Sequence, residues 1–124
     1  MFVMLGVAVG GAVGALSRSG LDRAIEQRSE SSFPWSTFVV NVAGCFLVGL
    51  VIAVLVDRHA APDWLRAALV VGFCGGFTTF STFAQETLDL LETSEAALAV
   101  VSISANVVLG VLAVLAGSRV GRLA

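Results

Sequence analysis

The stretch GFCGGFTTFSTF, Gly72–Phe83, decides how the third apolar segment of this chain folds. It lies in an uncharged run, yet it contains three glycines, four hydroxyl side chains and four phenylalanines. Glycine destabilises a helix interior by about 1 kcal/mol relative to alanine. The adjacent glycines Gly75 and Gly76, which are followed closely by two threonines, therefore predict an opening of the backbone in mid-segment. The alternative is that the glycines only let another helix approach closely.

Charged residues make up only 13% of the 124 residues, and their clustering leaves four long windows without Asp, Glu, Lys or Arg. These windows are Met1–Ser17, Trp35–Val56, Ala67–Gln85 and Ala96–Ser118. A membrane-spanning helix needs about 20 mostly apolar residues. The sequence therefore predicts an all-α membrane protein, a single domain over residues 1–124 with transmembrane helices at about 2–22, 35–56, 64–91 and 96–117.

The first window, Met1–Ser17, is also long enough for a secretory signal, but no Lys or Arg precedes Arg18. Its glycines Gly6, Gly10 and Gly14 recur at every fourth position, a spacing typical of close packing between membrane helices. We therefore expect this segment to remain in the protein as a helix that packs through its glycine face.

All seven basic residues are arginines, and four crossings divide them almost evenly between the two sides of the membrane. One side receives Arg58, Arg66, Arg119 and Arg122. The other side receives Arg18, Arg23 and Arg28. Because orientation normally follows a clear Lys/Arg excess on the cytoplasmic side, the near balance favours insertion both ways and an antiparallel dimer. The alternative is that a single arginine decides the orientation.

An opened backbone in mid-membrane leaves carbonyl oxygens that need partners, and such oxygens can coordinate a hard cation such as Na⁺. Nearby, Phe77, Phe80 and Phe83 recur every three residues. The positive edges of aromatic rings suit a small anion on a narrow path. The alternative for these rings is ordinary packing against other helices or lipid.

Asn41 is the single amide in the middle of the second segment, and its NH₂ group offers two hydrogen-bond donors to an anion. Its alternative role is to hold helices of different subunits together, and contact between helices is also the role we expect for Asn106. Ser81, Thr82 and Glu86 continue a polar line from the rings, although Glu86 is most simply a solvated charge at the membrane interface.

Three further side chains have simpler interpretations. Arg18, near the end of the first segment, would either reach the interface or attract anions in an aqueous vestibule. Cys45 and Cys74 lack metal-ligand spacing, and we interpret them as small buried hydrophobes rather than as a disulfide or metal site. The chain has no basic patch that would predict a nucleic-acid partner.

Three blocks of the sequence carry a family resemblance. They are GGFTTFSTF (Gly75–Phe83), PWSTFVVNVAGCFLVG (Pro34–Gly49) and GALSR (Gly14–Arg18). The first resembles the third-helix signature of the Fluc family of fluoride ion channels, also called CrcB proteins, almost residue for residue. The second is similar to that family's second-helix pattern, and the third resembles the end of its first helix.

The resemblance implies an antiparallel, dual-topology dimer with two separate fluoride pores, each lined by both subunits. It places the rings of Phe80 and Phe83 at the pore, with Asn41 as an amide donor to fluoride. It also assigns Ser81 and Thr82 to a polar track along the same path.

The resemblance further implies a structural Na⁺ at the dimer centre, held by the backbone carbonyls of Gly75 and Thr78 from both subunits. It places Arg18 in the vestibule. The chain departs from the family where Ser102 and Ser19 replace common tyrosines, and it has no tyrosine at all. Ala84 likewise stands where a serine is common. These departures leave open whether the partner is a second copy or an unlike homologous subunit.

The function implied by the resemblance is passive, selective export of fluoride across the cell inner (plasma) membrane, with fluoride, the bilayer and a second subunit as partners. One alternative is a small four-helix, proton-coupled multidrug transporter, but that mechanism needs a mid-membrane carboxylate, commonly in the first helix, and Met1–Ser17 has none. Another is a non-conducting subunit of a heterodimeric channel. We expect no enzyme, because no nucleophile–base set, metal-ligand cluster or phosphate loop is recognisable.

Overall fold

The computed structural model describes residues 1–56 and 61–124, so Arg58, expected on one side of the membrane, lies outside the described residues. The described residues form helices joined by short turns, without strands. Four helical rods are long and apolar enough to cross a membrane: Phe2–Glu26, Trp35–Leu55, Asp63–Glu92 and Ala96–Leu123. The prediction of an all-helical chain with four helices of spanning length is confirmed.

The rods are built from segments of different regularity. The first rod is α1 (Phe2–Glu26), and the last is α6 (Ala96–Leu123). The second consists of α2 (Trp35–Val51) and its wider, π-helical end η1 (Ile52–Val56). The third contains α3 (Asp63–Ala67), the π-helical η2 (Ala68–Cys74), the short α4 (Gly75–Phe77) and α5 (Phe80–Glu92).

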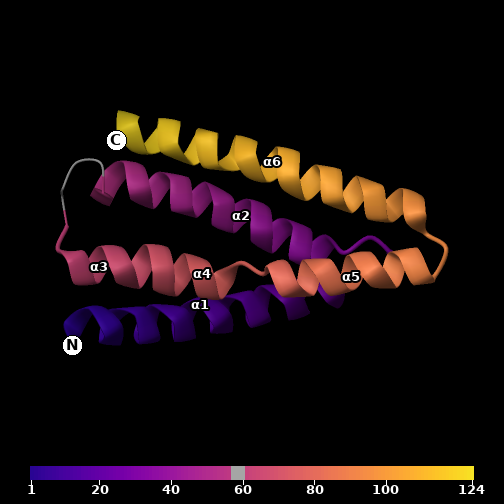
Figure 1. The fold of residues 1–124 in the computed structure, drawn as a ribbon, viewed down its shortest axis with the longest axis horizontal. Coiled ribbons are helices and arrows are strands. Elements are labelled where there is room, and N and C mark those ends of the chain that lie inside the picture. The colour runs from indigo at the N-terminus through magenta and orange to yellow at the C-terminus, as the bar shows by residue number, and fades with distance from the viewer. Residues whose placement is uncertain (57–60) are drawn as a thin grey trace.

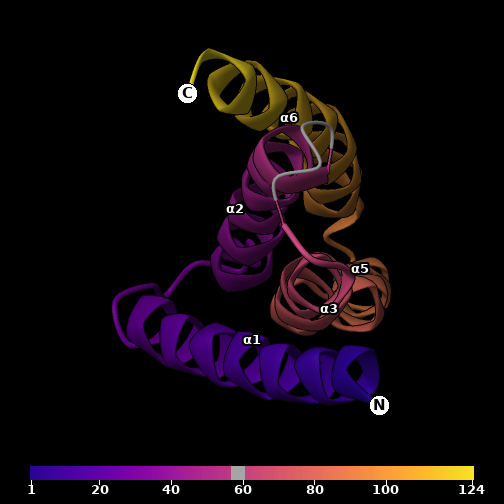
Figure 2. The ribbon, with the colours of Figure 1, turned by 90° about the vertical axis from the view of Figure 1, so that its left-hand side faces the viewer.

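The rods lie side by side, and both chain ends lie at the same end of the molecule, as four crossings require (Figure 1). The third rod runs from α3 through α4 to α5, with a short non-helical connection between α4 and α5 (Figure 1). Seen from its end, α2 lies between α6 and α1, with the third rod beside it (Figure 2). The main packing partners are α2 with α6, and α1 with η2 and α4.

Glycines set the close spacing between the rods. A methyl carbon built on Gly6 would lie 2.8 Å from the carbonyl oxygen of Trp64, and one on Gly14 would lie 2.9 Å from the amide nitrogen of Phe77. The predicted glycine packing face of α1 is therefore confirmed. The contact of α2 with α6 is equally close at Gly49, where a methyl carbon would lie 3.0 Å from a backbone nitrogen of α6.

Two helices extend beyond their expected ends. α1 continues past Asp22 to Glu26, and α6 continues past Gly117 to Leu123. Neither extension contains a proline, and Arg, Leu and Glu are good helix formers in water as well. The charge-free windows mark the part of each helix that suits the hydrocarbon core, so they underestimate helices that project into the polar region.

Candidate ion pathway at the helix break

The third rod is interrupted between α4 and α5 by two residues with extended backbone. The φ and ψ angles are −80° and 159° at Thr78, and −146° and 120° at Thr79. The predicted opening is confirmed, although it falls on the threonines while both preceding glycines stay helical. The close-approach alternative also holds, because a methyl carbon on Gly76 would lie 3.1 Å from the Cα atom of Gly11 in α1.

The two threonine hydroxyls stabilise the interrupted helix ends. Thr78, which follows the last residue of α4, donates a hydrogen bond from Oγ1 to the carbonyl oxygen of Cys74 at 2.9 Å. Thr79 Oγ1 accepts from the backbone nitrogen of Thr82 at 3.2 Å and caps the start of α5. Such an N-cap contributes about 1 kcal/mol. The Thr-Thr pair therefore ends one helix and begins the next.

Asn41 of α2 forms two hydrogen bonds with the backbone of Thr79. Asn41 Oδ1 accepts from Thr79 N at 2.9 Å, and Asn41 Nδ2 donates to Thr79 O at 3.1 Å. The same Nδ2 donates to Oδ1 of Asn106 in α6 at 3.2 Å, so both of its N–H groups have partners within the chain. The structure thus shows both asparagines joining helices within one chain, while contact between subunits and donation from Asn41 to an anion stay predictions.

The hydrogen bond from Thr79 N to Asn41 and the N-cap formed by Thr79 together leave two backbone carbonyls without their helical hydrogen bonds. In an uninterrupted helix, the amides of Thr79 and Thr82 would donate to the carbonyl oxygens of Gly75 and Thr78. Here these amides donate instead to Asn41 Oδ1 and to Thr79 Oγ1. The two released carbonyls belong to the same two residues for which cation binding is predicted.

Arg18 contacts one of these carbonyls. Its Nη1 donates to the carbonyl oxygen of Thr78 at 3.3 Å, and its side chain is half-buried between α1 and the break. The guanidinium therefore reaches inward to the break, while its predicted place in a vestibule remains a prediction. The contact shows that the Thr78 oxygen is accessible to a positive group.

Two aromatic rings stand at the start of α5. The ring centroids of Phe80 and Phe83 are 5.7 Å apart, and Phe80 is 79% exposed on the single chain. Phe77 does not continue this row, because it is only 6% exposed and stacks on Phe73 with a centroid distance of 5.8 Å. For Phe77 the alternative of ordinary packing therefore holds, and the extended residues of the break separate it from the other two rings.

A cavity of about 440 Å³ at the break gathers most of the predicted site residues. Its lining includes Asn41, Gly75, Thr78, Phe80, Phe83 and Asn106. The free thiols Cys45 and Cys74 also line it. The cavity is open beside Gly75, which is exposed and where an added methyl carbon would meet no atom of residues 1–56 or 61–124 within 4 Å. Three predicted site residues lie outside its lining, namely Ser81, Thr82 and Arg18.

Glu86 of α5 is tied to α2 rather than left in water. Thr37 Oγ1, on a buried side chain, donates to Glu86 Oε1 at 2.9 Å. The second carboxylate oxygen of Glu86 is buried and has no hydrogen-bond partner among the described residues. The expectation of a solvated interface charge is therefore wrong for Glu86. Sequence alone carries no signal for this contact, because packing joins two distant segments.

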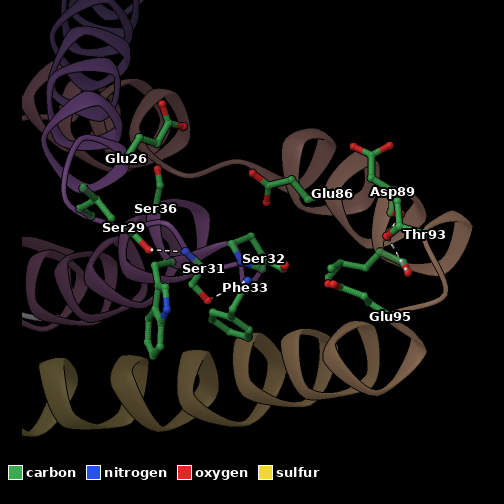
Figure 3. Close-up of a pocket in the computed structure, with 14 residues that line it drawn as sticks. Glu26, Ser29, Ser31, Ser32, Phe33, Ser36, Glu86, Asp89, Thr93 and Glu95 are labelled. Atoms are coloured by element: carbon green, nitrogen blue, oxygen red, sulfur yellow. Dashed lines mark hydrogen bonds between the residues drawn. The ribbon is translucent and has the colours of Figure 1, made fainter.

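A second cavity, of about 430 Å³, lies where the loop after α1 meets the turn between α5 and α6. Its acidic lining residues are Glu26, Glu86, Asp89 and Glu95. Figure 3 shows the carboxylates of Glu86 and Glu95 extending into this space, opposite a serine-rich loop, whereas that of Asp89 points away. We call it the acidic vestibule. It places water-accessible polar groups next to the Thr37–Glu86 pair.

Four rods of spanning length, one of them broken in mid-segment beside a cavity that Asn41 and Thr78 help to line, define an integral membrane protein. The family model described as CrcB-like protein, Camphor Resistance (CrcB), matches residues 5–118. The chain belongs to this family and is a multi-pass membrane protein.

Relatives of the chain share most of its length. A protein named fluoride-specific ion channel FluC from Acidobacterium capsulatum is 45% identical over 94% of this chain and 94% of its own length. Its namesake from Magnetococcus marinus is 42% identical over 94% of this chain and 95% of its own length. A third, from Flavobacterium psychrophilum, is 38% identical over 90% of both chains.

Proposed function

We propose that this protein is a fluoride-selective ion channel of the cell inner (plasma) membrane, which passively exports fluoride and lowers its cytoplasmic concentration. The observation that carries the proposal is the cavity at the helix break, where two phenylalanine rings and an asparagine amide meet in a spanning segment. Relatives similar to this chain over about nine tenths of its length are named as fluoride-specific channels.

The path for the anion would run along the start of α5. The rings of Phe80 and Phe83 would offer their positive edges, which attract an anion without holding it as tightly as a full charge. Asn41 would donate to the passing anion by exchanging its bond to Asn106. The exposed hydroxyls of Ser81 and Thr82 would extend the path toward the acidic vestibule.

The proposed unit is an antiparallel, dual-topology dimer of two copies, or of this chain with a homologous subunit. Phe80 is 79% exposed, so the single chain provides only one wall of a pore. The near-balanced arginines favour both orientations. A second subunit packed over the break would exclude lipid from Phe80 and close the open side of the cavity at Gly75.

A structural Na⁺ is part of this proposal, and the released carbonyls fit it. The carbonyl oxygens of Gly75 and Thr78 from both subunits would hold the ion, and Gly75 is exposed where a second copy would dock. Na⁺ bound there supplies a fixed positive charge at the dimer centre. Since like charges repel strongly away from water, Arg18 would then leave the Thr78 oxygen and turn toward the vestibule.

The positions of the acidic side chains favour passive fluoride export over proton-coupled transport. Hydrogen fluoride, a weak acid, enters cells uncharged and dissociates inside, and the membrane potential drives the trapped anion out through a selective leak. A proton-coupled multidrug transporter would need a carboxylate in mid-membrane. α1 has none before Asp22, and Glu86 lines the acidic vestibule rather than the cavity at the break.

Fluoride efflux from liposomes that contain only the purified chain tests the proposal, with chloride-loaded liposomes as the control. We expect fluoride efflux without chloride efflux. A folded dimer that passes neither ion, alone or together with a homologous subunit, would contradict the proposal.

A further inference from the structure

Two asparagine side chains connect α6 to the helix break in series. Asn106 Nδ2 donates to the backbone carbonyl oxygen of Ser102 at 2.9 Å. Asn106 Oδ1 accepts from Asn41 Nδ2 at 3.2 Å. Asn41 Oδ1 in turn accepts from Thr79 N at 2.9 Å. We call this series the amide relay; it runs from a backbone group of α6 through α2 to a backbone group at the break.

The two ends of the amide relay fix the orientation of both amides. A backbone carbonyl only accepts hydrogen bonds and a backbone N–H only donates them, whereas a side-chain amide can rotate to present either its oxygen or its nitrogen. Because Ser102 O can only accept, the group of Asn106 that faces it must be the nitrogen, and the Asn106 oxygen is then directed at Asn41. Asn41 then directs its nitrogen at Asn106 and its oxygen at Thr79 N. The reverse orientation would set donor against donor at Thr79.

The consequence lies in the backbone at the break. The amide of Thr79 is the group that would close the helix by donating to Gly75 O. Held by Asn41, it cannot do so, and it is shielded from water because Thr79 is only 8% exposed. The amide relay therefore keeps Gly75 O from forming its helical hydrogen bond, and the residues that do so belong to α6 and α2.

We propose that Asn106 is a positioning residue, which holds the helix break open by orienting Asn41 against Thr79. It acts through Asn41 and not by contact with a bound cation. The proposal deepens the function proposed above, on which it rests for the role of the released Gly75 carbonyl as a cation ligand. It also explains why an amide is present in the middle of a largely apolar helix, where an unpaired polar group is costly.

Hydrogen exchange at the Thr79 amide, measured by NMR on the full chain in lipid nanodiscs, tests this role directly. Asn106→Leu removes the relay at similar side-chain volume, so Asn41 loses its contact with α6 and keeps only its two hydrogen bonds to Thr79. We expect exchange at Thr79 to become about tenfold faster, the effect of weakening one buried hydrogen bond. Unchanged exchange at Thr79 in a folded Asn106→Leu protein would overturn the proposal.

Two further variants separate positioning from general damage. Ser102→Ala is the matched control, because the buried Ser102 hydroxyl has no hydrogen-bond partner in the described part of the chain, while the carbonyl used by the relay remains. It should leave exchange at Thr79 unchanged, and acceleration equal to that in Asn106→Leu would overturn the proposal. Asn106→Asp in acidic buffer restores one donor and one acceptor as a carboxylic acid. It should preserve Thr79 protection, and so should its carboxylate after correction for intrinsic exchange, because both forms present an oxygen to Asn41 Nδ2. Faster exchange in the acid form would overturn the proposal.

Failure of the relay and failure of the proposed function give different results. If Asn106→Leu accelerates exchange at Thr79 but the unmodified chain conducts no fluoride, the positioning role stands and the channel function fails. If the unmodified chain conducts fluoride but the exchange rate at Thr79 is the same in Asn106→Leu, the positioning role fails and the channel function stands. Should Asn106→Leu not fold, Asn106→Ala also removes the acceptor of Asn41 Nδ2 and should accelerate exchange at Thr79, and unchanged exchange in it would overturn the proposal.

Discussion

Phe77 and Phe80 offer a matched pair for testing whether the exposed rings line an ion path. They are three residues apart, on opposite sides of the break, but Phe77 is 6% and Phe80 79% exposed. Phe80→Ile removes almost no packing within the chain, so its stability should stay within about 0.5 kcal/mol of the unmodified chain. Phe77→Ile removes a ring stacked on Phe73 and should destabilise the fold by about 1–2 kcal/mol.

The effect on conduction should be the opposite. An edge-on contact between a ring and an anion contributes on the order of 1 kcal/mol, so Phe80→Ile should slow fluoride efflux about fivefold or more. Phe77→Ile should retain its rate per folded channel. Efflux from liposomes, normalised to the folded fraction, and unfolding in detergent measure the two effects. Normal efflux in folded Phe80→Ile and Phe83→Ile proteins would refute the assignment of the rings to the pathway.

Three other changes test separate parts of the account. Asn41→Asp should abolish fluoride efflux, because a carboxylate oxygen would replace Nδ2 opposite the acceptors Thr79 O and Asn106 Oδ1 and would add negative charge. Cys45→Ser is the control, a neutral change in the same cavity, and normal efflux in both variants would contradict the prediction. Arg18→Gln should slow fluoride efflux mainly at low ionic strength, where a single charge acts over the longest distance; an effect independent of salt would argue against electrostatic attraction. A cysteine at the exposed Ser31 should react with an impermeant reagent from both sides of the membrane; labelling from one side only would favour a fixed orientation.

The helices and the break follow from local features that the sequence displays directly. Runs without charged residues predict the four rods because unpaired charges are excluded from hydrocarbon. The break follows from Gly75 and Gly76 together with threonine hydroxyls that can satisfy the opened ends. The exact place of the break, at Thr78 and Thr79, is less local. It depends on Asn41, which binds the Thr79 backbone from another helix.

The features that the sequence hides are those made by packing between distant segments. Glu86 has the sequence context of an interface charge, and only the placement of α2 beside α5 brings Thr37 to it. The even spacing of Phe77, Phe80 and Phe83 describes one row only in a continuous helix, and the break separates Phe77 from the other two rings. The amide relay joins residues of α6, α2 and the break, an arrangement that no spacing along the chain encodes.

The most direct test of the central claim is ion efflux from liposomes that contain this chain alone, with fluoride and chloride measured in parallel. The account predicts rapid fluoride efflux without chloride efflux, lost in Asn41→Asp. Efflux of chloride as fast as fluoride, or no fluoride efflux with or without a homologous subunit, would contradict the claim that the helix break forms a fluoride pathway.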